Sequence, residues 1–250
     1  MKKTFFLGFI FLLISCDSEN SWDCVQAAGD SVSKEYTVLD FSKIRIEDDV
    51  TLYLKQGEPQ QVRLETGENL LSDISVSVEG KTLVVKDHNS CNLVRDYGIT
   101  KVFVTAPNIT EIRNSSAYDV IGEGILNFPE LTLVSNSTAG PDNIRKSGDF
   151  YLNINCEVFR VIANGQSVFY ITGYSQKSSL SFDDEMPRFE GQNLVIDELT
   201  VSQRSANKMI VNPRQSIVGK IMATGDIISH NRPPLVDVKE LFTGKLLFED

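Results

Sequence analysis

The sequence predicts an all-β protein, folded as a single-domain β-solenoid over residues 36–250. From Tyr36 onward, short runs alternate apolar and polar residues, as in Val50–Leu54 and Ile74–Val78. This period of two places alternate side chains on opposite faces of a strand. Turn residues separate the runs, and no stretch keeps a period of 3.6 over three helical turns. Both observations indicate strands throughout this region.

A repeated unit after Pro107 favours the solenoid over other all-β folds. The unit is a short strand, a small or polar corner and a second short strand. The corners centre on Ser116, Ser137, Gly165, Ser205 and Gly225, at intervals of 21, 28, 40 and 20 residues. A period near 20, with one insertion and one double step, is typical of stacked turns that share a core. A β-sandwich also spaces its strands regularly, but it does not require the same unit five times.

The first residues predict a lipoprotein signal peptide, residues 1–15. Lys2 and Lys3 precede the uncharged run Phe5–Ile14, which is too short for a bilayer span of about 20 residues. The run ends in Leu13-Ile14-Ser15-Cys16, which resembles the bacterial lipobox, so Cys16 is the expected site of lipid attachment. The alternative is an ordinary signal peptide with a chance cysteine. Residues 16–35 then form the lipidated cysteine and a polar tether without periodicity. We therefore expect the membrane to be a partner through the lipid anchor.

Composition excludes some functions. The chain has 34 acidic and 24 basic residues, a net charge of −10, which becomes −12 once residues 1–15 are removed. This excess of acid argues against nucleic acid as a partner. Two histidines and four cysteines provide little material for a metal site, and no cofactor is expected. Cys156 is expected to be buried, while a disulfide between Cys24 and Cys91 is an open alternative.

The strand motifs resemble those of the head-GIN-domain family of auto-transporter adhesins. Phe41, Ile44 and an alternating strand that ends in Gln56-Gly57 match the opening of the family pattern. A strand ending in Ala106-Pro107 and the later Gly225-Asp226-Ile227 match further motifs. The resemblance covers residues 36–248. It implies a right-handed parallel β-helix and a lipid-anchored or secreted protein of Bacteroidetes-type bacteria.

Catalytic motifs are missing from the sequence, so the protein is expected not to be an enzyme. It has no nucleophile elbow, zinc-protease motif, P-loop or complete GxGxxG motif. The densest acidic run, Asp183-Asp184-Glu185, is interpreted as a solvated turn, because adjacent acids point in different directions. The alternative is a carbohydrate-active β-helix lyase or hydrolase. Its candidate active-site residues are Asp142, Arg160, Asp183 and Arg188.

Two tyrosines are the candidate ligand-binding residues. Alternation places Leu152 and Ile154 inside, so Tyr151 points outward, and the same argument places Tyr170 outward. The two lie 19 residues apart, close to one repeat, so they could stack as an exposed ladder that grips a sugar chain. The alternative is that stacked rings simply stabilise neighbouring strands.

Together these features predict a non-catalytic lipoprotein of the cell envelope, an adhesin-like binding or scaffolding module. Its expected partners are a glycan or a surface protein. The expected location is the outer membrane. Asp17 and Glu19 after the lipidated cysteine resemble a surface-export signal of Bacteroidetes-type lipoproteins and favour the outer face, whereas in enteric bacteria an aspartate directly after the cysteine favours retention in the inner membrane. Besides the enzyme, a structural envelope protein that assembles with itself is a second alternative.

Overall fold

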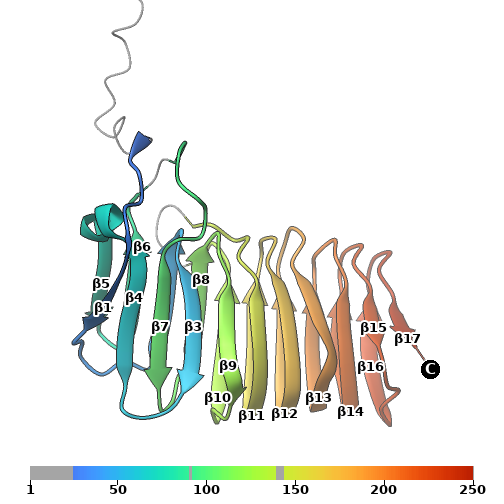
Figure 1. Cartoon of the computed structure of the whole chain (residues 1–250). Helices are drawn as coiled ribbons and strands as arrows, with labels where there is room; N and C mark the ends of the chain where they lie inside the picture. Colours follow the sequence, from blue (N-terminus) through green and yellow to red (C-terminus); the bar gives the residue numbers. More distant parts are fainter. Residues whose placement is uncertain (1–24, 90–91, 139–143, 250) are drawn as a thin grey trace, which may run out of the picture.

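The fold is built almost entirely of strands, as the computed structural model shows for residues 25–89, 92–138 and 144–249 (Figure 1). A short 3-10 helix, η3 (Glu68–Asp73), lies between two of the strands. The strands are β1 (Ser31–Tyr36), β2 (Lys43–Asp48), β3 (Thr51–Gln56), β4 (Gln61–Gly67), β5 (Ile74–Glu79), β6 (Thr82–Asp87), β7 (Lys101–Ala106), β8 (Glu111–Ser116), β9 (Val120–Leu126), β10 (Glu130–Ser135), β11 (Phe150–Ala163), β12 (Val168–Phe182), β13 (Arg188–Gln203), β14 (Met209–Ile221), β15 (Ile227–Ser229), β16 (Leu235–Glu240) and β17 (Leu246–Phe248). The predicted all-β class is confirmed.

The strand pairs form two layers around one core. The β3 layer has the order β1-β4-β7-β3-β9, continues through the first parts of β11 to β14, and ends at β15 and β17. The β2 layer has the order β5-β6-β2-β8-β10, continues through the second parts of β11 to β14, and ends at β16. Because β11 to β14 run through both layers, the strands make one mixed sheet around a common core.

The right-handed parallel β-helix over residues 36–250 is wrong as a description of this sheet. Strands β1 and β7 both pair antiparallel with β4, and β5 pairs antiparallel with β6. A tight turn at Gly80, whose φ is +62°, joins β5 to β6, and such a turn can link only antiparallel neighbours. The repeat on which the prediction rested begins after Pro107, and extending it back to Tyr36 caused the error.

The turns at one end of β11 to β14 lie on top of one another. The Met186 N–H donates to Gly165 O at 3.0 Å, and the Gly225 N–H donates to Ser205 O at 3.0 Å. A Cβ on Gly225 would lie 2.0 Å from Asn207 O, so this turn has no space for a side chain. This close stacking explains why small residues recur at the interval found in the sequence.

The core contains phenylalanine rings stacked on neighbouring strands. Phe150 and Phe169 face each other in register on β11 and β12, with ring centroids 4.7 Å apart. Phe169 also lies 6.0 Å from the ring of Phe182, and all three side chains are fully buried. Phe169 therefore packs both against the neighbouring strand β11, through Phe150, and against Phe182 at the far end of its own strand.

We expect Phe169→Ala to lower the free energy of unfolding by about 3–5 kcal/mol, since it removes a buried ring and leaves a cavity. The matched variant is Tyr170→Ala, one residue along and facing outward. It should cost at most about 1.5 kcal/mol, the value of an aromatic pair. Denaturant unfolding followed by circular dichroism measures both. Equal costs for the two variants would contradict the assigned faces of β12.

Candidate binding face

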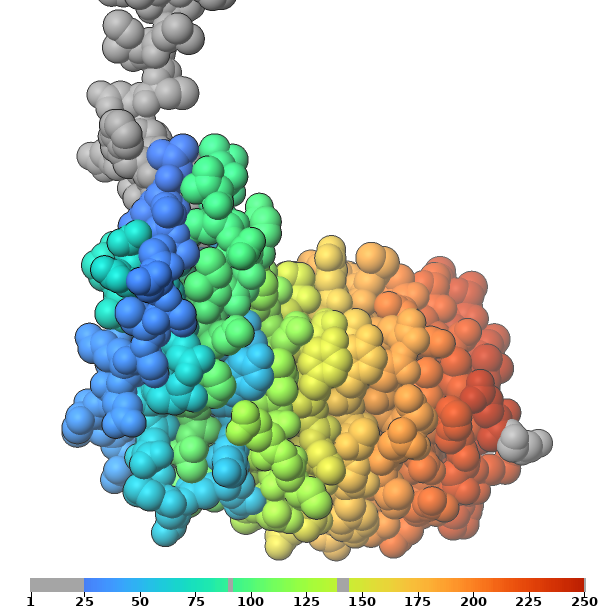
Figure 2. Space-filling view, viewed as in Figure 1, coloured from blue at the N-terminus to red at the C-terminus, as the bar shows by residue number. Residues whose placement is uncertain are grey.

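The outward side of the β3 layer carries a row of large apolar side chains, the outer aromatic row. Its members are Phe103 on β7, Tyr53 on β3, Ile121 on β9, Tyr151 on β11 and Tyr170 on β12. Each is in register with the next: Phe103 with Tyr53, Tyr53 with Ile121, Ile121 with Tyr151, and Tyr151 with Tyr170. Strand alternation points each of them away from the core. Figure 1 labels these strands side by side on one face of the molecule, and Figure 2 shows the same face in space-filling form.

The two tyrosines of the predicted pair form a stack within this row. The Tyr151 and Tyr170 ring centroids are 4.7 Å apart, the ring planes differ by 7°, and the residues are 40% and 39% exposed. Stacked carbon atoms come into contact at about 3.5 Å. The rings are therefore offset, and each leaves part of one face open to solvent.

Sequence reasoning missed a second stack in the same row. Tyr53 and Phe103 stack with centroids 4.8 Å apart and planes 13° apart. The Arg63 guanidinium lies 4.1 Å from the Phe103 ring centroid, which places a cation over its open face. The alternation of β3 and β7 places each ring outward, but 50 residues separate the two rings in the chain. No local signal in the sequence brings them together.

A cavity of about 540 Å³ opens at the β4 end of the row. Phe103, the first residue of the row, lines the cavity, and so does Arg63, which lies on β4 next to Phe103. The rest of the lining is mainly polar, with carboxylates on Glu35, Asp40 and Glu123 and amides on Gln60 and Gln61. The cavity therefore offers hydrogen-bond donors and acceptors beside an aromatic ring, as ligand sites commonly do.

Asp119 and Asp149 lie directly before β9 and β11, the strands that carry Ile121 and Tyr151 of the row. Asp149 accepts a hydrogen bond from the Val168 N–H at 2.8 Å, and Asp119 accepts one from the Asp149 N–H at 2.9 Å. The Tyr151 hydroxyl donates to Asp149 at 3.4 Å. Burial, and secondarily the charge of Asp119, raise the pKa of Asp149. Desolvation first, and then the charges of Asp149 and Asp119, raise the pKa of Tyr151 to about 12.

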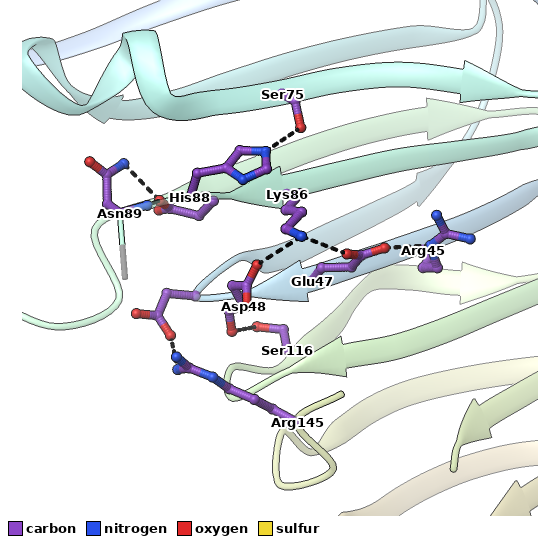
Figure 3. Close-up of polar contacts among 11 residues, drawn as sticks. Arg45, Glu47, Asp48, Ser75, Lys86, His88, Asn89, Ser116 and Arg145 are labelled. Carbon is purple, nitrogen blue, oxygen red and sulfur yellow. Dashed lines mark hydrogen bonds and ion pairs between the residues drawn. The ribbon is translucent and has the colours of Figure 1, made fainter. Parts of the chain in front are cut away.

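The β2 layer carries a polar cluster whose charges pair with one another (Figure 3). Glu47 accepts from Arg45 at 2.6 Å and lies 3.7 Å from Lys86, which also lies 4.0 Å from Asp48. Arg145 pairs with Asp49 at the edge of this cluster. These contacts already use the charges, so this cluster is a weaker candidate for a ligand site than the aromatic row.

The residues considered for a carbohydrate-active enzyme do not pair with one another. Arg160 lies 3.3 Å from Glu130, and Arg188 pairs with Glu190. The two histidines also have separate partners, since His88 contacts the Ser75 hydroxyl at 3.2 Å and His230 pairs with Glu249 at 3.1 Å. Asp183 and Asp184 are exposed in the turn between β12 and β13. Asp142 lies outside the described residues. Among the residues that the structure describes, no group of three His, Cys, Asp or Glu side chains could hold a metal ion.

The structure describes one of the four cysteines. Cys156 is free and buried, and desolvation raises the pKa of its thiol to about 12. The lipid site Cys16 and the cysteines of the alternative disulfide, Cys24 and Cys91, lie outside the described residues. Within the described part of the chain, no helix is long and apolar enough to cross a membrane.

Comparison with known proteins identifies the family. Residues 40–233 match the model of the family described as "Putative auto-transporter adhesin, head GIN domain", and the chain belongs to this family. A search of curated proteins finds no match. The family description is consistent with a protein of the cell surface or envelope and gives no indication of an enzyme.

Solved structures share the fold. A "putative adhesin" from Bacteroides fragilis is similar with a TM-score of 0.78 at 18% identity, covering 90% of this chain and 100% of that one. A "putative adhesin" from Parabacteroides distasonis has a TM-score of 0.67 at 12% identity, over 89% and 99% of the two chains. A "putative lipid binding protein" from the same species has a TM-score of 0.58 at 11% identity, over 89% and 98%.

Tyr151 should titrate near pH 12, about two units above an ordinary tyrosine. Because the folded pKa is raised, this group stabilises the fold below pH 10, and the contribution is lost as the pH rises from about 10 to 12. Phenolate absorbance against pH measures the titration. The absorbance change near pH 12 should disappear in Tyr151→Phe. In Asp149→Asn it should shift to lower pH, since the neighbouring charge is removed. A change near pH 12 that persists in Tyr151→Phe would contradict the assignment of this titration to Tyr151.

Proposed function

We propose that this protein is a non-catalytic, lipid-anchored binding module of the cell envelope that holds a glycan along the outer aromatic row. The observation that carries the proposal is the continuous register from Phe103 to Tyr170, which brings five outward apolar side chains from five neighbouring strands into one line. Membership of an adhesin-type family supports the coarser statement of a binding role.

The chemistry of the row suits a sugar chain. A pyranose ring has a face of C–H groups that packs on an aromatic ring and hydroxyl groups around its edge that need hydrogen-bond partners. The row offers partly open ring faces, and the carboxylates and amides of the adjoining cavity offer partners for hydroxyls, whereas Arg63 already pairs with Glu65 and lies over Phe103. Strands about 4.8 Å apart give the five-strand row a length of roughly 20 Å, enough for more than one sugar unit.

The carboxylates beside the tyrosines favour binding over hydrolysis. A glycosidase needs two carboxyl groups on opposite sides of the bond that it breaks. Here Asp149 accepts a hydrogen bond from the Val168 N–H at the start of β12, and Asp119 accepts one from the Asp149 N–H directly before β11. They act as structural acceptors that join successive strands, and their shared position at the strand starts places them on one side of the row.

The test starts from an array of glycans, surface proteins and lipid vesicles probed with residues 17–250, which contain all of the strands. We expect binding to a glycan, weakened about tenfold by Tyr151→Ala or by Tyr170→Ala, since about 1.4 kcal/mol of stacking corresponds to that factor. Tyr174→Ala is the matched control. Tyr174 is 39% exposed on the same strand, but it lies four residues along and bonds to Asp197 at 2.7 Å.

Three results would contradict this function. Binding that both tyrosine variants leave unchanged would place the ligand elsewhere on the molecule. Cleavage of the bound glycan would replace the binding module with the carbohydrate-active enzyme. Binding to vesicles alone would favour a lipid ligand, as named for one of the similar structures.

The proposed anchor is a lipid on Cys16 in the outer membrane, with the protein facing outward. The basic start, the apolar run Phe5–Ile14 and the cysteine support it. A net charge of −12 for the mature chain disfavours a position flat on an anionic membrane surface.

Cys16→Ala should remove the protein from the membrane fraction or leave its signal peptide uncleaved, because the lipid attachment site is lost. Metabolic labelling with a fatty acid, followed by fractionation, measures both. Cys156→Ala serves as the control and should stay lipidated. Labelling that persists in Cys16→Ala would rule out the anchor, and resistance to protease on intact cells would rule out the outward position.

A further inference from the structure

The sheet has edge strands at both ends. At the N-terminal end these are β1 and β5, which pair antiparallel with β4 and β6. At the other end, β16 pairs only with β14 within the described residues (Figure 1). Large apolar side chains are exposed there, including Leu235 at 54% and Leu241 at 62%. An uncovered edge strand of this kind is a ready template for another strand.

The backbone of β16 has its free hydrogen-bonding groups at this edge. The Leu241 N–H donates to Ile221 O at 2.8 Å, so it points toward β14. Because these directions alternate along a strand, the N–H groups of Val236, Val238 and Glu240 point away from β14. These three residues can form a ladder with an added strand.

The side chains of β16 match a second copy of the same strand. In an antiparallel pair with a two-fold axis at Val238, Asp237 of one copy lies opposite Lys239 of the other, and the reverse. These two positions are the non-hydrogen-bonded pairs, in which side chains approach most closely. The same register places Leu235 opposite Leu241. Axes at Asp237, Lys239 or Glu240 would instead place like charges opposite each other.

Charge within the chain also favours this partner. Lys239 lies in register with Lys220 of β14, so its neighbour on the closed side is another cation. No ion pair joins Asp237 or Lys239 to any described residue. A lysine on an edge strand usually discourages pairing. Here a carboxylate two residues earlier makes the strand complementary to itself.

We propose that the β16 edge is a homodimer interface, formed by antiparallel pairing of β16 with β16 of a second copy about a two-fold axis at Val238. Such an interface is isologous, since each copy contributes the same surface. It extends the β2 layer from one copy into the next and covers the apolar side chains at the end of the sheet. This inference does not depend on the proposed glycan site, which lies on the β3 layer.

Sedimentation equilibrium of residues 17–250 over a wide range of concentrations tests the interface. The wild-type chain should dimerise, and Asp237→Lys or Lys239→Asp should each weaken dimerisation by more than about tenfold, since each creates two like-charge contacts across the axis. The double variant Asp237→Lys/Lys239→Asp exchanges the charges and should restore the dimer. Asp184→Lys, an equal change of charge in an exposed turn, should have no effect, and circular dichroism should show that all variants are folded.

Three outcomes would overturn the interface. A wild-type chain that stays monomeric at every concentration would leave the edge to another partner. A dimer that neither single variant weakens would lie elsewhere on the surface. Two weakened single variants without recovery in the double variant would rule out the register at Val238.

Discussion

The register between β11 and β12 is the constraint on which the rest of the structure depends. It places Phe150 opposite Phe169 inside and Tyr151 opposite Tyr170 outside, so one set of backbone hydrogen bonds fixes both the core and the binding face. A shift of one residue would exchange the two faces and expose the phenylalanines. Glycine supports the close approach of these strands, because a Cβ on Gly173 would lie 2.1 Å from Ile154 O.

The two ends of the sheet differ in the direction of their strand pairs. Antiparallel strands cover the N-terminal end, where the cavity and Arg63 adjoin the aromatic row. Parallel pairs continue to the other end and stop at β16 and β17. Glycan binding along one layer and self-pairing at the edge of the other would therefore use separate surfaces. A dimer would offer two rows to one partner and raise its apparent affinity through multivalency.

Alternation and turn residues were enough to predict the all-β class and the outward positions of Tyr151 and Tyr170. These features are local, since each depends on residues a few positions apart. Strand partners are not local. The sequence around Val62 indicates a strand but contains nothing to show that it lies antiparallel between β1 and β7. Tyr53 and Phe103 were missed for the same reason, because only the assembled sheet brings them into the row.

We propose that the ligand lies on the outer aromatic row. Hydroxyl-radical footprinting, with and without the glycan that binds most tightly, tests it directly, because it reports the solvent exposure of individual side chains in the unmodified chain. Tyr151, Tyr170 and Tyr174 have nearly equal exposure in the free protein, which makes them a matched set. We expect the ligand to protect Tyr151 and Tyr170 from oxidation and to leave Tyr174 unchanged. Protection of Tyr174 alone, or of none of the three, would contradict it.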